Sequence, residues 1–143
     1  MPGSVPCTSV GLLLGDAVVA AFANGVIRIF SSRGARSLAI EVVAHAVAVT
    51  AITTHATAPT FASVGDDGVV NVWTLPELLV RRSGGAGSGA GGVGVGPLVL
   101  GMTARSASLH CGVAFFSPPS VTKGDVLVTA AYDAKSLLCF KEL

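Results

Sequence analysis

The sequence AHAVAVTAITTHATAPTFASVGDDGVVNVWTL, from Ala44 to Leu75, decides the fold. It contains three short apolar runs, which cover Val47 to Ala51, Phe61 to Val64 and Val69 to Trp73. Apolar residues that alternate with small or polar ones indicate half-buried β-strands. The turn between the second and third runs is Asp66-Asp67-Gly68, whose residue types favour a tight reversal. The stretch therefore predicts three strands joined by turns.

This stretch resembles one repeat of the WD-repeat β-propeller family. His45 stands at the Gly-His position of such a repeat, Ser63 in the second strand, Asp67 in the tight turn, and Trp73-Thr74 in place of Trp-Asp. The resemblance implies a structural tetrad of His45, Ser63, Asp67 and Trp73, which pins the loop before a blade to its second and third strands. The indole donates to the hydroxyl, the hydroxyl donates to a neutral imidazole, and the imidazole donates to the carboxylate.

An earlier repeat keeps the strand pattern without the tetrad. Asn24-Gly25 between apolar runs is a strong hairpin signal, because both residues tolerate positive φ. Phe30 lies 43 residues before Trp73, within the period of roughly 40–45 residues that such repeats have. The same shift puts Ala20 at the serine position and Pro2 at the histidine position.

A third repeat matches the tetrad only in part. Thr129, Asp133 and Phe140 take the places of its serine, aspartate and tryptophan. Phe140 comes one residue later than the other two predict, so the turn before it carries an extra residue. The same spacing puts the histidine position on Cys111, with His110 beside it.

The predicted fold class is therefore all-β, a partial WD-repeat β-propeller with about three blades of antiparallel four-stranded sheet. We expect a single domain over residues 1–143, with blade 1 at about 8–43, blade 2 at about 44–102 and blade 3 at about 107–143. Blade 2 includes a flexible glycine-rich loop at 83–96, and blade 3 lacks its outer strand. Because rings of this type need roughly four to eight blades, we expect upstream propeller blades or a second copy of the chain to complete it.

Charge and hydropathy argue against a nucleic-acid or membrane partner. The net charge of +1 offers no electrostatic attraction to phosphate groups. The most apolar stretches, Thr8 to Phe30 and Leu38 to Ile52, are interrupted by charged and polar residues, whereas a membrane-spanning helix needs roughly 20 mostly apolar ones. No signal-peptide pattern opens the chain, so we expect a cytoplasmic protein.

The sequence also predicts no cofactor and no metal site. The three cysteines, Cys7, Cys111 and Cys139, are widely spaced and match neither a zinc motif nor a disulfide framework. We expect them to be free and mostly buried thiols. The glycine-rich run lacks the Gly-Lys-Ser/Thr ending of a phosphate-binding loop.

We predict a non-catalytic protein–protein interaction scaffold, whose partners bind loops on the two faces of the propeller. On the tetrad side these are the loops near His45, Asp66-Asp67 and His110; on the opposite side they are Arg33–Arg36, His55–Pro59 and Ser117–Lys123. We expect Asp66 to face solvent and His55 to be a solvated histidine.

The alternative is a hydrolase-like enzyme with a site at the propeller mouth. Ser63, His45 and Asp67 have the residue types of a catalytic triad, but Ser63 lies inside a strand pattern instead of on an exposed nucleophile elbow. A mouth site would need His110, Cys111 and Asp133, or His55, to converge on a pocket. No catalytic residue is predicted.

Overall fold

The computed structural model describes residues 3–14, 17–31, 38–75, 98–117 and 124–141. The expected glycine-rich loop at 83–96, the Arg33–Arg36 loop, Pro2 and residues 118–123 of the Ser117–Lys123 loop lie outside these ranges.

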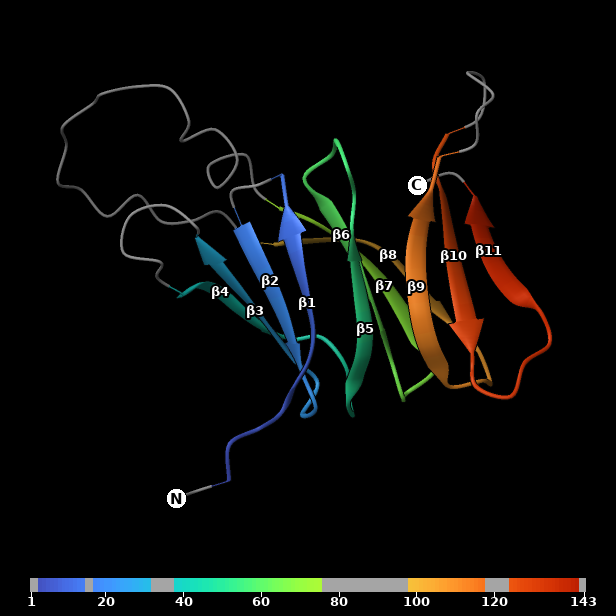
Figure 1. The fold of residues 1–143 in the computed structure, drawn as a ribbon, viewed down its shortest axis with the longest axis horizontal. Helices are drawn as coiled ribbons and strands as arrows, with labels where there is room; N and C mark the ends of the chain where they lie inside the picture. The colour runs from blue at the N-terminus through green and yellow to red at the C-terminus, as the bar shows by residue number, and fades with distance from the viewer. Residues whose placement is uncertain (1–2, 15–16, 32–37, 76–97, 118–123, 142–143) are drawn as a thin grey trace, which may run out of the picture.

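The described residues form eleven strands in three antiparallel sheets (Figure 1). The first sheet has the order β1 (Cys7–Leu13), β2 (Ala17–Phe22), β3 (Val26–Ser31) and β4 (Leu38–Val43). The second has the order β5 (Val49–Thr54), β6 (Thr60–Gly65), β7 (Val69–Thr74) and β8 (Val99–Arg105). The third contains β9 (His110–Phe116), β10 (Val126–Ala131) and β11 (Leu137–Lys141). The predicted all-β fold class is confirmed, and β8 extends three residues past the expected end of blade 2 at residue 102.

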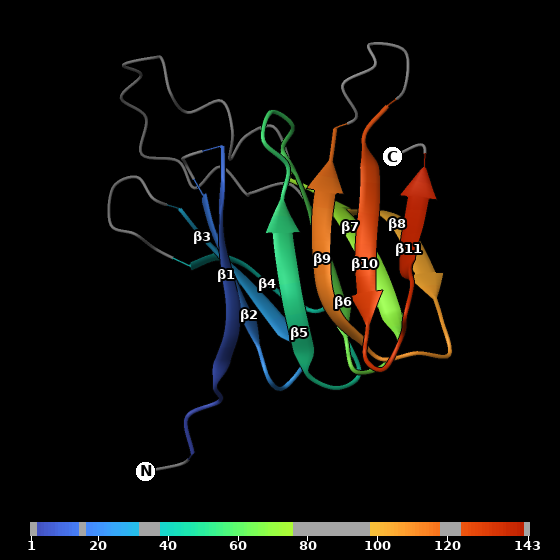
Figure 2. The same cartoon turned by 45° about the vertical axis from the view of Figure 1, so that its right-hand side comes forward.

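The sheets stack face to face, with β1, β5 and β9 side by side, as Figures 1 and 2 both show. One cluster of buried side chains lies between the first and second sheets and includes Val19, Ile29 and Phe61. A second cluster lies between the second and third sheets and includes Val64 and Leu127. The middle sheet is therefore buried on both faces, which explains why β6 and β7 are nearly continuous apolar runs.

Two glycine turns connect each sheet to the segment that enters the next one. Gly25 and Gly68 have φ of 82° and 71°, a backbone conformation that glycine adopts without steric cost. The Gly25 carbonyl accepts the His45 N–H at 3.1 Å, and the Gly68 carbonyl accepts the Ser106 N–H at 2.8 Å. A Cβ at Gly68 would lie 2.5 Å from the Ser106 carbonyl oxygen. The carbonyl of a turn glycine thus binds the segment that leads to the next sheet, in the first sheet and again in the second.

Among the described residues, no helix is long and apolar enough to span a membrane.

Candidate functional site

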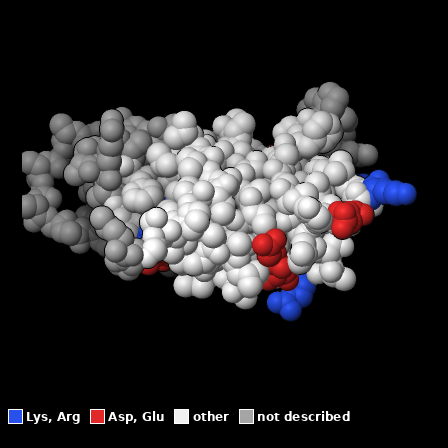
Figure 3. Space-filling view, turned by 60° about the horizontal axis from the view of Figure 1, so that its bottom comes forward, with Lys and Arg blue, Asp and Glu red and all other residues white. Residues whose placement is uncertain are grey.

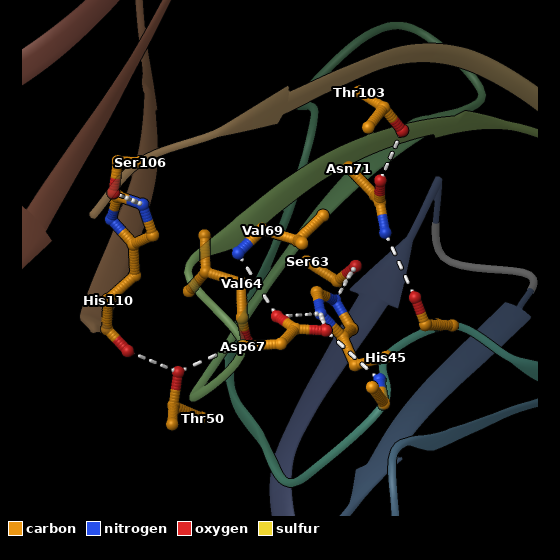
Figure 4. Close-up of polar contacts among 12 residues, drawn as sticks. His45, Thr50, Ser63, Val64, Asp67, Val69, Asn71, Thr103, Ser106 and His110 are labelled. Atoms are coloured by element: carbon orange, nitrogen blue, oxygen red, sulfur yellow. Dashed lines mark hydrogen bonds and ion pairs between the residues drawn. The ribbon is translucent and has the colours of Figure 1, made fainter. Parts of the chain in front are cut away.

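The four residues predicted as a tetrad are linked by hydrogen bonds at the second sheet. Figure 4 shows three of them, His45, Ser63 and Asp67. Trp73 Nε1 lies 3.0 Å from Ser63 Oγ, and His45 Nε2 lies 2.9 Å from the same oxygen. On the other side of the imidazole, His45 Nδ1 lies 3.0 Å from Asp67 Oδ1. Ser63 is fully buried and His45 nearly so.

The donors and acceptors of the tetrad allow only one direction for its series of hydrogen bonds. Trp73 can only donate, so Ser63 Oγ accepts from it and directs its own proton to His45 Nε2. His45 Nδ1 then carries the ring proton and donates to the Asp67 carboxylate. Each donor has an acceptor, so the buried polar groups of the tetrad are satisfied.

Asp67 also organises the backbone around the tetrad. Oδ2 accepts the Ala46 N–H at 3.0 Å, and Oδ1 accepts the Val69 N–H at 3.0 Å. Burial alone would raise the pKa of this carboxyl. The hydrogen bonds from His45, Ala46 and Val69 together have a larger, opposite effect, so the pKa lies below its ordinary value. One ionised side chain therefore holds the loop before β5 against the β6–β7 turn.

The absence of a side chain at Gly65 provides the space for the His45 ring. A Cβ at Gly65 would lie 2.6 Å from His45 Nδ1 and 2.9 Å from the Ala48 carbonyl oxygen. Sequence reasoning missed this residue, although a glycine at the end of a strand pattern signals close approach of another group.

Asn71 is a second residue that sequence reasoning missed. It is 4% exposed on β7; its Nδ2 donates to the Ala44 carbonyl at 3.0 Å, and its Oδ1 accepts from Thr103 Oγ1 at 2.5 Å. These two hydrogen bonds tie β7 to the neighbouring strand β8 and to the segment after β4 (Figure 4). A lone amide inside the apolar run Val69 to Trp73 was the available signal, because a buried amide needs partners.

The third sheet corrects the predicted alignment of its histidine position. Ala131 pairs with His110, as Gly65 pairs with Val49. The connection between these paired residues is five residues longer in the third sheet, so the constant spacing used for prediction fails there. Cys111 is not at the histidine position.

Strand register places Ser106 at that position instead. Ser106 Oγ donates to the Ser108 carbonyl at 2.9 Å and lies 2.9 Å from His110 Nε2. In the third sheet, the contact between Ser106 and His110 thus takes the place that the His45 imidazole has in the second sheet (Figure 4). Burial lowers the pKa of His110, against opposing effects of the Gly68 backbone and the Asp67 charge.

The predicted partial tetrad of Thr129, Asp133 and Phe140 makes no equivalent network. Phe140 pairs with Leu127 as Trp73 pairs with Phe61, but its ring has no N–H to donate. Thr129 Oγ1 is buried without a hydrogen-bond partner. Asp133 is exposed at φ 59° and has no hydrogen-bond partner within the described part of the chain.

The sequence predicts a solvated His55, and this prediction is wrong. Its side chain is 12% exposed, and Nε2 lies 2.5 Å from Asp125 Oδ2. Its Nδ1 accepts the backbone N–H groups of Thr57 and Ala58, at 3.2 and 2.9 Å. We call this contact the His55 bridge, because it joins the β5–β6 loop of the second sheet to the residue before β10 in the third.

The far end of the His55 bridge is also fixed. Ser117 Oγ donates to Asp125 Oδ1 at 2.6 Å, and the Phe115 ring meets His55 edge to face, with centroids 5.1 Å apart. The hydrogen bond from Ser117, followed by that from His55, lowers the pKa of Asp125. The sequence offered no signal for this pair, whose members lie 70 residues apart.

The structure does not bring together the three residues that a mouth-type enzyme site would need. His110 and Cys111 line one surface hollow between the second and third sheets, with Thr50, Asp66, Leu109 and Tyr132. Asp133 lies outside this lining, in the turn between β10 and β11. Within the described ranges, no group of three or more histidine, cysteine or acidic residues is arranged to hold a metal ion.

The cysteines differ from expectation in their exposure. Cys7, Cys111 and Cys139 are all free, but each is exposed instead of buried. Cys7 lies on β1 of the first sheet, and Cys111 and Cys139 lie on β9 and β11 of the third.

No family model and no curated protein sequence matches this chain. Among solved structures, the chain is similar to the β-propeller domain of Cps50 (Swd1) from Myceliophteria thermophila, with a TM-score of 0.72 and 16% sequence identity. The match covers 96% of this chain and 38% of that one. The chain therefore folds as a partial β-propeller. From here on the three sheets are called the first, second and third blades.

Proposed function

We propose that this chain is a non-catalytic protein–protein interaction scaffold, a WD-repeat propeller segment that presents loops to partners. The observation that carries the proposal is the tetrad, which fixes the loop before β5 to the β6–β7 turn through paired polar groups. A loop that is already ordered loses less conformational entropy on binding.

Proximity cross-linking with mass spectrometry, in cells that express the chain, tests this proposal. Two sets of surface variants with unchanged circular dichroism should be compared, one on the tetrad side and one in the His55–Pro59 loop. We expect one set to lose a specific cross-linked protein that the other set retains. Identical cross-links for wild type and both sets would contradict the scaffold function.

We further propose that the two end blades take further blades as partners, from upstream propeller blades or from a second copy. Val10 and Leu12 on β1 are 62% and 64% exposed, and Phe116 and Leu137 of the third blade are 53% and 62% exposed. Exposed apolar patches of this kind mark interfaces, and β11 offers an unpaired strand edge. Gel filtration with light scattering should show dimers or larger species at micromolar concentration; a monodisperse monomer would contradict this proposal.

Two finer assignments are also proposals. The Val5-Pro6-Cys7 segment, Ala44-His45-Ala46 and Tyr132-Asp133 resemble the C-terminal blades of WD repeat-containing protein 54. We also propose a cytoplasmic location, because three exposed free thiols suit a reducing compartment. Fractionation of cells that express the tagged chain tests the location.

A further inference from the structure

A surface hollow lies between the second and third blades on the side of the tight turns. Its volume is about 280 Å³, and its lining is Thr50, Asp66, Leu109, His110, Cys111 and Tyr132. These residues come from the starts of β5 and β9 and from the ends of β6 and β10. Figure 3 shows this side of the molecule, where most side chains are uncharged and only a few are acidic or basic.

The walls of the hollow are apolar and exposed. Leu109 is 49% exposed and Tyr132 is 70% exposed, although both are large side chains that a folded chain normally covers in part. Together they offer an aliphatic surface and an aromatic ring to a ligand that enters from solvent.

Asp66 supplies the negative charge of the lining. Its side chain is exposed and has no hydrogen-bond or ion-pair partner among the described residues, whereas the neighbouring Asp67 is engaged by His45. No lysine or arginine contributes to the lining. The hollow is therefore complementary to a cation.

Backbone contacts hold these groups in place before any ligand binds. The Asp66 N–H donates to the Ala48 carbonyl at 3.0 Å, and the Tyr132 N–H donates to the Leu109 carbonyl at 2.7 Å. Thr50 Oγ1 lies 2.6 Å from the His110 carbonyl oxygen and so ties the two blades together at the base. A preformed site loses little conformational entropy on binding.

We propose that this hollow binds an arginine side chain that a protein partner presents. The methylene stem packs on Leu109 and Cys111, while the guanidinium reaches the Asp66 carboxylate and stacks on the Tyr132 ring. Arginine suits the site better than lysine, because its planar group can stack and form two parallel hydrogen bonds to a carboxylate. This inference rests on the proposed scaffold function and names the chemistry of the partner.

The test is an NMR titration of the full chain with N-acetyl-arginine methylamide as the probe. We expect amide shifts at Asp66, Leu109 and Tyr132, with millimolar affinity that weakens as salt is added. The citrulline analogue, which has nearly the same shape without the charge, and the leucine analogue should each bind at least about threefold more weakly, because neither forms a charge-assisted bond.

The matched variants are Asp66→Asn and Asp133→Asn, two exposed aspartates in turns on the same side of the molecule. Asp66→Asn should remove the preference for arginine over citrulline, whereas Asp133→Asn should retain it. Equal binding of arginine and leucine analogues, shifts confined to other surfaces, or an unchanged preference in Asp66→Asn would each overturn the assignment. Circular dichroism checks that both variants fold.

The outcome separates this inference from the scaffold function itself. If the cross-linked partner is lost only by variants of the His55–Pro59 loop, the scaffold function holds and the arginine site fails. If the probe binds at the hollow but no variant alters any cross-link, the hollow binds arginine but the scaffold function fails, and with it the protein partner that would present the arginine.

Discussion

The second and third blades share their strand pairing but differ in how they satisfy buried polar groups. In the second blade, Ser63 accepts from Trp73 and donates to His45. In the third blade, the corresponding Thr129 hydroxyl is buried without a partner, and Phe140 cannot donate to it.

Space for the imidazole explains much of this difference. Gly65 leaves room for His45 in the second blade, whereas the third blade has Ala131 at the matching position and the small Ser106 side chain at the histidine position. In the first blade Phe22 holds that position. The comparison teaches that the tetrad depends on a missing Cβ as much as on its four polar residues.

The largest expected effect is that of Asp67→Ala. The change removes the acceptor of His45 Nδ1, Ala46 N–H and Val69 N–H in one step. We expect a loss of about 3 kcal/mol in the free energy of unfolding, since the buried His45 and Val69 donors lose their acceptor together. Denaturant titration at fixed protein concentration measures it.

The neighbouring Asp66→Ala is the matched control for that variant. Asp66 is exposed and its carboxylate has no partner among the described residues, so the change should cost less than about 0.5 kcal/mol. Equal midpoints for the two variants would show that Asp67 does not hold the turn.

Gly65→Ala should come next, at about 2 kcal/mol. The added methyl would lie 2.6 Å from the His45 ring and 2.9 Å from the Ala48 carbonyl oxygen, so the backbone or the imidazole must shift. The reverse change in the third blade, Ala131→Gly, should cost only about 0.5–1 kcal/mol through backbone entropy. If thermal unfolding shows similar losses, the Gly65 position does not control the tetrad.

Lowering the pH should reduce the free energy of unfolding by less than the Gly65→Ala substitution does. The folded-state pKa of Asp67 lies below its ordinary value, so its ionised form stabilises the fold above about pH 4, the pKa of an unfolded aspartate. This contribution is lost as pH falls through the lowered folded-state pKa. Unfolding free energies measured between pH 6 and pH 3 should fall more steeply for the wild type than for Asp67→Asn; parallel curves would contradict the assignment.

Much of the fold follows from local sequence patterns. The turns at Asn24-Gly25 and Asp67-Gly68 and the alternating runs beside them predict the hairpins, because turn chemistry and side-chain alternation act within a few residues. The grouping of His45 and Ser63 came from family spacing, which holds where loop lengths match.

The sequence could not predict contacts that depend on loop length or on packing between blades. The longer β9–β10 connection moved the histidine position from Cys111 to Ser106. The pairing of His55 with Asp125 arises only when two blades pack. Neither residue belongs to a local pattern, so only the three-dimensional structure identifies them.

In the His55 bridge one imidazole has two roles: Nε2 contacts Asp125, and Nδ1 accepts from the backbone of the β5–β6 loop. Two variants distinguish these roles. Asn at this position keeps an acceptor near Nδ1 for the Thr57 and Ala58 amides but does not reach Asp125; Gln reaches Asp125 but loses that acceptor. We expect a loss of about 1 kcal/mol for each.

Hydrogen exchange should tell the two variants apart. Amide protection at Thr57 and Ala58 should persist in His55→Asn and fall in His55→Gln. The reverse pattern would mean that Nδ1 does not order the β5–β6 loop. Equal protection in both variants would show that the turn is held by other contacts.

The smallest effect, and the one of opposite sign, is expected for Thr129→Val. Valine has nearly the same shape as threonine, and the change removes a buried hydroxyl that has no hydrogen-bond partner, so the variant should be unchanged or up to about 1 kcal/mol more stable. Ser63→Ala, at the matching position of the second blade, should instead cost roughly 1–3 kcal/mol, because the Trp73 N–H loses its acceptor and His45 loses its donor. Denaturant midpoints of the two variants measure the contrast. A loss for Thr129→Val as large as that for Ser63→Ala would mean that the third blade satisfies its threonine, and that the two blades do not differ in the way proposed.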